Sequence, residues 1–328
     1  MASHKVLMYS FKGGAGRTVS MANIAYIMAS EMGKRVVCID LDIESAGASV
    51  LFGLQDEVRA GRCWTLQDVL RGYFDPPGLG PKRREGGRQT ITLGTANFEQ
   101  QVWQQLARRI HTAADGGYLD FLPSRTIITA LGEPRAFSAS SMTIFERLLQ
   151  KIDLLASPPD YVLFDSASGL QDAATLGLHN CNTLVIFVRW SRQFVFGTIH
   201  FIRDYILTPT MTRRLANVLV VPTAVPVIPA GGALGEQVAK RKEDLVHTVR
   251  SVNVDAVKKF EAQRANWISV LDPIYECAGL KWDDRVFLME NSQPPDQETT
   301  TVLNAYRSLA VSIVKSRDGG DGRTPARD

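Results

Sequence analysis

The stretch FKGGAGRTVS, residues 11–20, is the part of the sequence that decides the fold. It follows the apolar run KVLMYSF (Lys5–Phe11), which is typical of a buried strand, and it leads into Thr18–Glu31, where apolar residues recur at helical spacing. A glycine-rich turn between a buried strand and a helix is the setting in which backbone N–H groups bind phosphate. We therefore interpret this stretch as a phosphate-binding loop.

The residue types of this loop suit the phosphates of a nucleotide. Its glycines allow a tight turn, and the helix that begins near Arg17 adds the positive end of its dipole. Thr18 can offer its hydroxyl to Mg²⁺, and Arg17 stands where such loops ordinarily carry the lysine that reaches the β- and γ-phosphates. A ligand-free glycine turn is the alternative, but it leaves the basic residues and the threonine unexplained. The predicted nucleotide contacts are Gly13, Gly14, Ala15, Gly16, Arg17, Thr18 and Val19.

Acidic residues end two further apolar runs of the sequence. Asp40 ends RVVCID and is followed two positions later by Asp42, and Asp165 ends YVLFD. Ligands of open α/β sheets bind at the carboxyl ends of the strands, and alternate strand residues point the same way. The alternative is a polar strand end that caps the following loop. Beside a phosphate loop we favour the functional interpretation.

The segment KGGAGRT resembles the deviant Walker A motif, K-G-G-x-G-K-[ST], of the ParA/MinD ATPases. These belong to the SIMIBI class of P-loop proteins, with the nitrogenase iron protein and the arsenite-pump ATPase. The hallmark of the family is a second basic residue at the start of the loop, here Lys12. The resemblance implies that ATP with Mg²⁺ is held between two copies of the chain, with Lys12 reaching the partner's nucleotide.

The same resemblance assigns roles to the acidic strand ends. Asp42 would orient the attacking water, and Asp40 would lie closer to the metal. The segment YVLFDSASGL resembles a Walker B element, in which Asp165 would hold Mg²⁺ through a water molecule. The resemblance thus implies Thr18, Asp40 and Asp165 as metal-site residues, and Lys12, Arg17 and Asp42 as catalytic residues.

The sequence departs from the family pattern at three places. Arg17 replaces the usual lysine; it keeps the charge, so binding is expected to survive, whereas efficient hydrolysis is less secure. Ala167 stands where the family usually has proline. The stretch between the second expected strand and Asp165 is longer than in compact members, and we interpret residues 53–135 as a partner-specific insertion.

Base recognition is expected at VVPTAVP, Val220–Pro226, with Thr223 as the candidate contact, because relatives contact adenine there. A purely structural turn is the alternative. ATP is preferred over GTP by resemblance, since no N-K-x-D guanine motif occurs.

The alternation of apolar runs and helical patterns predicts a doubly wound, mostly parallel α/β sheet with helices on both faces. We expect a single domain over residues 1–316 and a disordered tail over residues 317–328. The expected strands are Lys5–Phe11, Arg35–Asp40, Gln89–Leu93, Tyr118–Leu122, Tyr161–Asp165, Thr183–Val188 and Asn217–Val221. The expected helices are Thr18–Glu31, Thr65–Leu70, Phe98–His111, Ser138–Ala156, Gln171–Leu178, Phe194–Ile206, Leu234–Arg264 and Thr300–Val314.

Composition limits the location and the partners of the chain. Its 328 residues carry a net charge of +3, too small to demand nucleic acid. The four cysteines lie far apart with no C-x-x-C pair, which favours a reducing, cytoplasmic compartment over a disulfide or zinc scaffold. No run of apolar residues is long enough for a transmembrane helix. The basic loop Pro76–Arg88 is interpreted as solvated, and non-specific DNA binding stays open.

Two functions follow from these features. The first is a ParA/MinD-like ATP hydrolase that dimerises on ATP and hydrolyses it slowly, driving the partitioning, positioning or switching of an unknown partner. The second is an interaction module that binds ATP with negligible turnover inside a larger complex. The partner would bind through residues 53–135 in either case.

Overall fold

The computed structural model describes two compact units. The first comprises Met1–Lys5 with Met28–Asn180, and the second comprises Val6–Ile27 with Cys181–Asp328. The residues described are 2–43, 45–70, 98–125, 139–226, 232–260, 267–277, 280, 286–290 and 295–318.

The first unit is built on β2 (Arg35–Asp40), which pairs in parallel with β4 (Tyr118–Leu122) and with β5 (Tyr161–Asp165). A further strand, β3 (Arg108–Thr112), runs antiparallel to β4. All residues of β4 and β5 are buried, as expected for parallel strands that are covered on both faces. Its helices are α2 (Gly47–Leu51), α3 (Gln55–Arg59), α4 (Leu66–Leu70), the π-helix η1 (Glu99–Trp103), α5 (Gln104–Leu106), α6 (Ala139–Ile152) and α7 (Asp172–Leu178).

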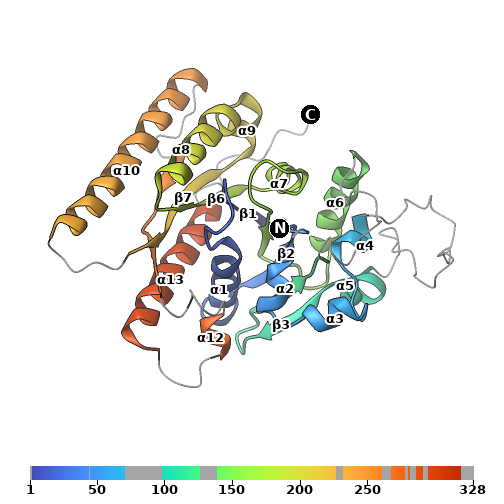
Figure 1. Cartoon of the computed structure of the whole chain (residues 1–328). Helices are drawn as coiled ribbons and strands as arrows, with labels where there is room; N and C mark the ends of the chain where they lie inside the picture. Colours follow the sequence, from blue (N-terminus) through green and yellow to red (C-terminus); the bar gives the residue numbers. More distant parts are fainter. Residues whose placement is uncertain are drawn as a thin grey trace. The chain divides into compact units, whose positions relative to one another are not determined.

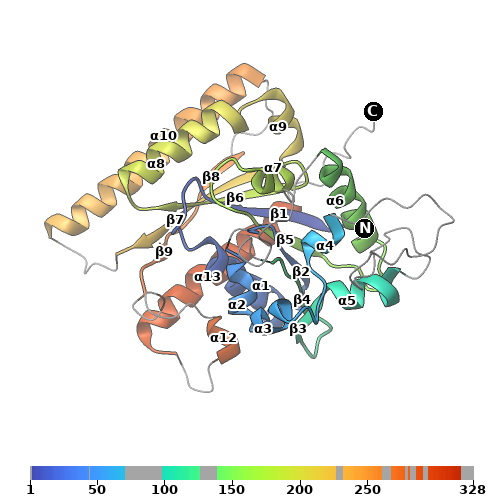
Figure 2. The ribbon, with the colours of Figure 1, turned by 45° about the vertical axis from the view of Figure 1, so that its right-hand side comes forward.

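The second unit contains most of β1 and a run of parallel strands (Figure 1). In order of pairing these strands are β1 (His4–Tyr9), β6 (Thr183–Arg189) and β7 (Asn217–Val225), and β7 pairs in turn with β8 (Ile268–Val270) and β9 (Ile274–Tyr275). Its helices are α1 (Arg17–Ser30, of which the last residues fall in the first unit), α8 (Arg192–Phe201), the π-helix η3 (Ile202–Ile206), α9 (Pro209–Arg214), α10 (Ala233–Phe260), α12 (Phe287–Glu290) and α13 (Gln297–Asp318). Figures 1 and 2 both show α8 lying alongside α10.

Hydrophobic burial explains why the segment around the phosphate loop folds as it does. Val6, Leu7 and Met8 of β1 are fully buried, and so are Met21 and Ile24 on the predicted apolar face of α1. Burying a side chain of this size contributes roughly 1.5–3 kcal/mol. The strand and the helix on either side of the loop are therefore anchored in the core, which fixes the two ends of the loop.

The expected fold class, a doubly wound and mostly parallel α/β arrangement, is confirmed. The boundaries of β2, β4 and β5 coincide with the predicted ones. The single-domain boundary and the insertion at 53–135 stay predictions. The expected strand Gln89–Leu93, the basic loop Pro76–Arg88 and most of the tail lie outside the described residues.

The predicted C-terminal end of one helix is wrong. The pattern predicted a helix over Phe98–His111, but helical structure stops at Leu106 and β3 begins at Arg108. Arg109 forms an ion pair with Asp120 of β4, and its guanidinium lies 4.1 Å from the ring centre of Tyr118. Antiparallel pairing with β4, which follows after the short connection at residues 113–117, therefore overrides the helical spacing of this segment.

The expected turn at Val220–Pro226 is also wrong. β7 continues through Val225, with Thr223 opposite Arg189 of β6 and opposite Ile274 of β9. The ladders on both sides of β7 hold this segment extended despite its proline. Only Ala224 departs, with a positive φ of 49°, where the pairing with β9 shifts register.

Two further structural findings concern the chain as a whole. All four cysteines are buried, and none forms a disulfide bond. Among the helices in the described part of the chain, none is long and apolar enough to cross a membrane.

Candidate functional site

The phosphate loop lies in the second unit, between the end of β1 at Tyr9 and the start of α1 at Arg17. Gly14 and Gly16 have φ angles of 79° and 72°, in the left-handed region that other residues rarely adopt. Both glycines are exposed, so the backbone of the loop is open to a ligand. These two positions therefore require glycine for conformational reasons and leave room for phosphate.

The first turn of α1 supplies the second part of the phosphate site. Ser20 N–H donates to the Gly16 carbonyl, 3.0 Å away, which closes the first turn. The preceding N–H groups have no intrahelical acceptor, and with the helix dipole they favour an anion. Thr18 is half-buried in this turn, where the sequence placed it.

Arg17 is buried beneath the loop, with 8% of its surface exposed. Its Nη1 donates to Ser10 Oγ at 3.0 Å. Ser10 is itself fully buried, and its hydroxyl donates to the Lys12 carbonyl at 2.9 Å. The arginine that replaces the usual lysine is thus tied to the start of the loop through one serine, which sequence reasoning missed.

The end of β6 and the first turn of α8 lie next to the loop. Lys12 is exposed, and its Nζ donates to Gln193 Oε1 at 3.1 Å. Arg189, at the end of β6, has its Nη1 3.9 Å from the position that a Cβ on Gly14 would take. Arg189 and Gln193 belong to RWSRQ, directly after an apolar strand. The rule that ligands bind at carboxyl strand ends could have identified Arg189.

The acidic residues lie in the first unit, at the ends of β2 and β5. Asp40 and Asp165 are opposite each other in the parallel ladder, and both are fully buried. Leu41 N–H donates to the Asp165 carbonyl at 2.8 Å, which holds the two strand ends together. The structure therefore brings together two carboxylates that are distant in the sequence.

Asp40 is held in an environment that disfavours its negative charge. Its Oδ1 accepts the Asp42 N–H at 2.9 Å, while its Oδ2 is buried with no hydrogen-bond partner among the described residues. Burial, with the charges of Asp165 and Asp42 added, raises the pKa of the Asp40 carboxyl well above its ordinary value. A cation at this carboxylate would offset that cost.

This environment fits a divalent cation such as Mg²⁺. Within the described ranges, no group of three or more His, Cys, Asp or Glu residues is arranged to hold a metal ion. Mg²⁺ does not need such a group, because it is usually bound by one or two carboxylates together with phosphates and waters. The buried Oδ2 of Asp40 supplies one such carboxylate oxygen.

Asp42 lies just beyond the end of β2 and keeps 8% of its surface exposed. Its Oδ1 accepts the Ser45 N–H at 3.2 Å, and its carbonyl accepts the Ala46 N–H at 2.8 Å. The sequence left open that an acidic residue here caps the following loop, and the Oδ1 atom of Asp42 does so. The same contacts hold its carboxylate in a defined place.

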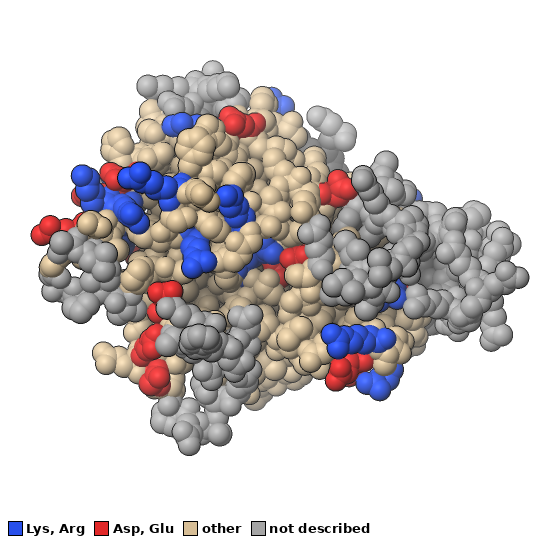
Figure 3. All heavy atoms as spheres, in the orientation of Figure 1, with Lys and Arg blue, Asp and Glu red and all other residues tan. Residues whose placement is uncertain are grey.

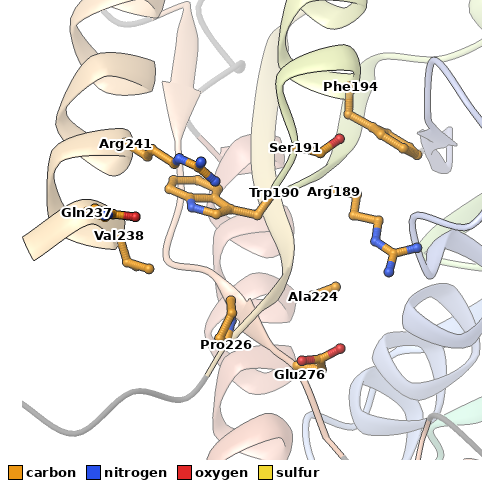
Figure 4. A pocket seen from close by; sticks show the side chains of 10 residues that line it. All are labelled: Arg189, Trp190, Ser191, Phe194, Ala224, Pro226, Gln237, Val238, Arg241 and Glu276. Atoms are coloured by element: carbon orange, nitrogen blue, oxygen red, sulfur yellow. The ribbon is translucent and has the colours of Figure 1, made fainter. Parts of the chain in front are cut away.

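Thr223 lies beside a pocket of about 490 Å³ in the second unit (Figure 4). Its Oγ1 is buried without a hydrogen-bond partner in the part of the chain that is described, and its carbonyl accepts the Trp190 N–H at 3.2 Å. Figure 4 shows the Trp190 ring beside Arg241, with Glu276 pointing toward Ala224. The lining comes from the ends of β6 and β7, from α8 and α10, and from the residue after β9: Arg189, Trp190, Ser191, Phe194, Ala224, Pro226, Gln237, Val238, Arg241 and Glu276.

These features define a class of protein. A loop with left-handed glycines that joins a buried strand to a helix, in a mostly parallel α/β fold, defines a P-loop nucleotide-binding protein. The family model described as an AAA domain matches residues 3–212, more than half of the chain, and the chain belongs to this family. Its fold is that of the ParA/MinD-type P-loop ATPases among the solved structures.

The curated relatives match short stretches of this chain. An uncharacterized ATP-binding protein of Methanocaldococcus jannaschii is 40% identical over 76 residues, which is 22% of this chain and 28% of that protein. A second ATP-binding protein of that organism is 39% identical over 70 residues, 21% of this chain and 24% of that protein. The chain thus matches about a quarter of the length of these relatives.

Solved structures match along nearly the whole chain. The MinC:MinD cell division complex of Aquifex aeolicus gives a TM-score of 0.54 at 16% identity, over 99% of each chain. An ATP complex of a Cyanothece McdA variant gives 0.58 at 11% identity, again over 99% of each chain. MinD of Pyrococcus horikoshii with Mg-ADP gives 0.55 at 16% identity, over 95% of this chain and 96% of that one. At these identities the likeness shows the fold.

Proposed function

We propose that this chain binds ATP with Mg²⁺, dimerises on ATP and hydrolyses it slowly to drive the partitioning, positioning or switching of a partner. The observation that carries the proposal is the phosphate loop, whose exposed glycines are accompanied by one exposed cation, Lys12, and one buried cation, Arg17. A loop with a single buried cation is suited to binding the phosphates of one nucleotide in its own chain. An exposed second cation is suited to a nucleotide held by another copy.

The phosphates are bound by the loop from Gly13 to Val19 and by Arg17 in this proposal. Catalysis is mainly positioning and charge neutralisation, as in other phosphoryl-transfer sites. Arg17 neutralises charge on the β- and γ-phosphates, and Lys12 does so across the dimer. Support for the Lys12 role comes from its exposure and from its hydrogen bond with Gln193, which holds the side chain at the surface of the loop.

The proposed residues for Mg²⁺ are Thr18, Asp40 and Asp165. When bound, Mg²⁺ would neutralise negative charge on the phosphates and orient the phosphate oxygens. Asp42 positions the attacking water through the carboxylate that Ser45 holds in place. Support for the metal role comes from the buried Oδ2 of Asp40 and from the raised pKa of that carboxyl.

The base of the nucleotide is proposed to meet Thr223. The buried Oγ1 of Thr223 and the adjoining pocket support this assignment. Trp190 offers an aromatic face at the rim of the pocket for stacking. The preference for ATP over GTP is carried by the family resemblance.

The partner is proposed to bind through residues 53–135, and the chain is proposed to act in the cytoplasm. DNA is a weaker candidate partner. Figure 3 shows Lys and Arg side chains gathered over α8 and α10, but acidic side chains stand among them. A surface that binds DNA phosphates without sequence preference is expected to have a single sign of charge.

The proposal is tested by the mass of the purified protein in solution, measured by light scattering without nucleotide, with ADP–Mg²⁺ and with ATP–Mg²⁺. We expect only ATP–Mg²⁺ to shift the wild type to a dimer and Lys12→Ala to remain a monomer. Lys240→Ala, which removes an exposed lysine of α10, is the matched control and should dimerise. If ATP binds but the mass in solution stays the same with every nucleotide, the proposed ATP-dependent dimerisation is contradicted.

The second candidate is an interaction module that binds ATP with negligible turnover. The observation that favours it is Arg17, whose guanidinium is committed to Ser10 on one side. Steady-state phosphate release, with and without candidate partners or DNA, separates the two functions. If no partner raises phosphate release above the background rate, the second candidate, an ATP-binding interaction module, is favoured.

A further inference from the structure

Two contacts fix the position of α8 beside the start of the phosphate loop. The ring of Phe11 occupies the place that a Cβ on Gly197 would take, so the ring packs directly on the helix backbone. One turn earlier in α8, Gln193 Oε1 accepts the hydrogen bond from Lys12 Nζ at 3.1 Å. The two helix residues are four positions apart and therefore face the same way. The first turns of α8 thus run along the residues that open the loop.

The segment before α8 brings a further cation to the loop, Arg189, the last residue of β6. Its Nη1 lies 3.9 Å from the place that a Cβ on Gly14 would take, which is ordinary van der Waals distance. Figure 4 shows the Arg189 side chain pointing away from the ring of Trp190. Although Arg189 borders the pocket, its guanidinium is therefore directed to the loop backbone.

Arg189 differs in its surroundings from the two cations of the loop itself. Lys12 donates a hydrogen bond to Gln193, and Arg17 is buried with 8% of its surface exposed. Arg189 is exposed, and within the described ranges its guanidinium makes no hydrogen bond or ion pair with another residue. A guanidinium carries five N–H donors in a planar arrangement that matches two phosphate oxygens. The charge at the end of β6 is therefore available to an anion.

The topology of the sheet explains why this charge lies where the loop begins. β6 pairs in parallel with β1, so the carboxyl ends of the two strands lie side by side. The loop follows the carboxyl end of β1, and Arg189 stands at the carboxyl end of β6. The loop amides and the helix dipole offer only partial charges to a phosphate, whereas a guanidinium offers a full one.

We propose that Arg189 is a further phosphate-binding residue, whose guanidinium binds the phosphates that ATP and ADP share. The backbone N–H groups of such loops cradle the α- and β-phosphates, and Arg189 approaches the loop backbone at Gly14. The inference rests on the proposed binding of ATP at this loop. It goes beyond that proposal because Arg189 comes from a different strand, which the loop motif does not include.

The test is a calorimetric titration of ATP–Mg²⁺ and ADP–Mg²⁺ into the wild type and three variants at position 189. Arg189→Ala should weaken the binding of both nucleotides about tenfold, because it removes charge-assisted hydrogen bonds to phosphate. Arg189→Gln keeps most of the length without the charge and should lose nearly as much. Arg189→Lys keeps the charge and should stay within about threefold of the wild type.

Arg213→Ala is the matched control, because it removes the same charge from an exposed arginine of the same unit. Arg213 lies in the last turn of α9, which leads into the amino end of β7. Since β7 runs parallel to β6 and β1, this is the sheet edge opposite to the loop. Its affinities should equal those of the wild type. Melting temperatures are measured in parallel, and Arg189→Gln replaces Arg189→Ala if that variant does not fold.

Ionic strength separates phosphate binding from a packing role. Mobile ions screen the attraction between an exposed arginine and a phosphate. The tenfold loss caused by Arg189→Ala should therefore shrink to less than about threefold when NaCl is raised from about 50 mM to about 500 mM. A loss that comes from altered packing of the strand end does not depend on salt in this way.

The outcomes distinguish this inference from the proposed function. No loss at low salt, a loss confined to ATP, or a loss that salt leaves unchanged overturns the role of Arg189, while binding of ATP by the loop stands. A wild-type protein that binds neither ATP nor ADP overturns the proposed function instead. A loss with both nucleotides that salt reduces, and that Arg213→Ala does not show, establishes Arg189 as a phosphate-binding residue.

Discussion

The phosphate loop and the acidic strand ends carry opposite charges in opposite surroundings. The loop keeps its glycines and Lys12 exposed, and each of its two cations is held by a hydrogen bond to a neutral side chain. The carboxylates of Asp40 and Asp165 are fully buried and face each other across adjacent strands. The loop therefore offers exposed backbone and positive charge to an anion, whereas the buried acidic ends carry an electrostatic cost that a bound cation would relieve.

This difference indicates that the loop binds an anion and that the acidic strand ends bind a cation. An exposed loop with glycines and cations is suited to binding an anion from solvent. A buried carboxylate pair couples the stability of its unit to the presence of a cation. Three substitutions test this contrast.

The largest expected effect is on turnover, from Asp42→Ala. If the acidic ends serve chemistry, phosphate release should fall by roughly 100-fold or more, as for loss of a general base, while ATP affinity stays within a few fold. Asp296→Ala is the matched control, because Asp296 Oδ1 also accepts a backbone N–H three residues ahead, from Thr299 at 2.7 Å. Unchanged turnover in Asp42→Ala would remove Asp42 from the mechanism.

The second effect is on binding, from Gly16→Ala. This residue has a φ of 72° and open space around it, so the substitution strains the loop backbone without a clash. We expect ATP affinity measured by calorimetry to fall at least tenfold (about 1.4 kcal/mol) as the loop shifts. Gly53→Ala introduces the same strain at a φ of 68°, also in open space but outside the loop, and should bind ATP normally. Equal affinities in both variants would mean that the loop conformation is unimportant.

The smallest effect is on stability, from Asp40→Asn. Removing a buried charge next to Asp165 and Asp42 should raise the nucleotide-free stability by about 1 kcal/mol, since Asn Oδ1 can still accept the Asp42 N–H. The same variant should lose the stabilisation that Mg²⁺ adds to ATP. Urea unfolding with and without ATP–Mg²⁺ measures both quantities.

A matched carboxylate in the same unit sharpens this prediction. Asp160 Oδ1 lies 2.8 Å from Arg35 Nη2, so Asp160→Asn removes a favourable partner and should lower stability. If Asp40→Asn also lowers it, the acidic ends are not under electrostatic strain.

Prediction from sequence succeeded where the signal was local. The apolar runs at Arg35–Asp40 and Tyr161–Asp165 end where the strands end, because a buried strand is bounded by its first polar residues. It failed at Arg108–Thr112, which pairs with β4, and at Val220–Val225, which two neighbouring strands hold extended. Both failures come from pairing partners that a local pattern does not contain.

The candidate site divides in the same way. The glycines, Lys12, Arg17 and Thr18 were identifiable because their roles depend on spacing within a few residues. Ser10 and Gln193 were not, because a serine before the motif and a glutamine in a later helix carry no signal until the fold brings them to the loop. Arg189 was missed, although its place at the end of an apolar strand could have indicated it.

By itself, the sequence determined that this chain has a phosphate loop between a buried strand and a helix, since backbone conformation there depends on glycine and on local hydrophobic spacing. It also determined the family. Only the tertiary structure decided that Arg17 is anchored by Ser10, that Asp40 and Asp165 face each other unexposed, and that a pocket opens beside Thr223. Burial and side-chain contact depend on which distant segments pack together, and the pattern along one strand or helix does not specify that packing.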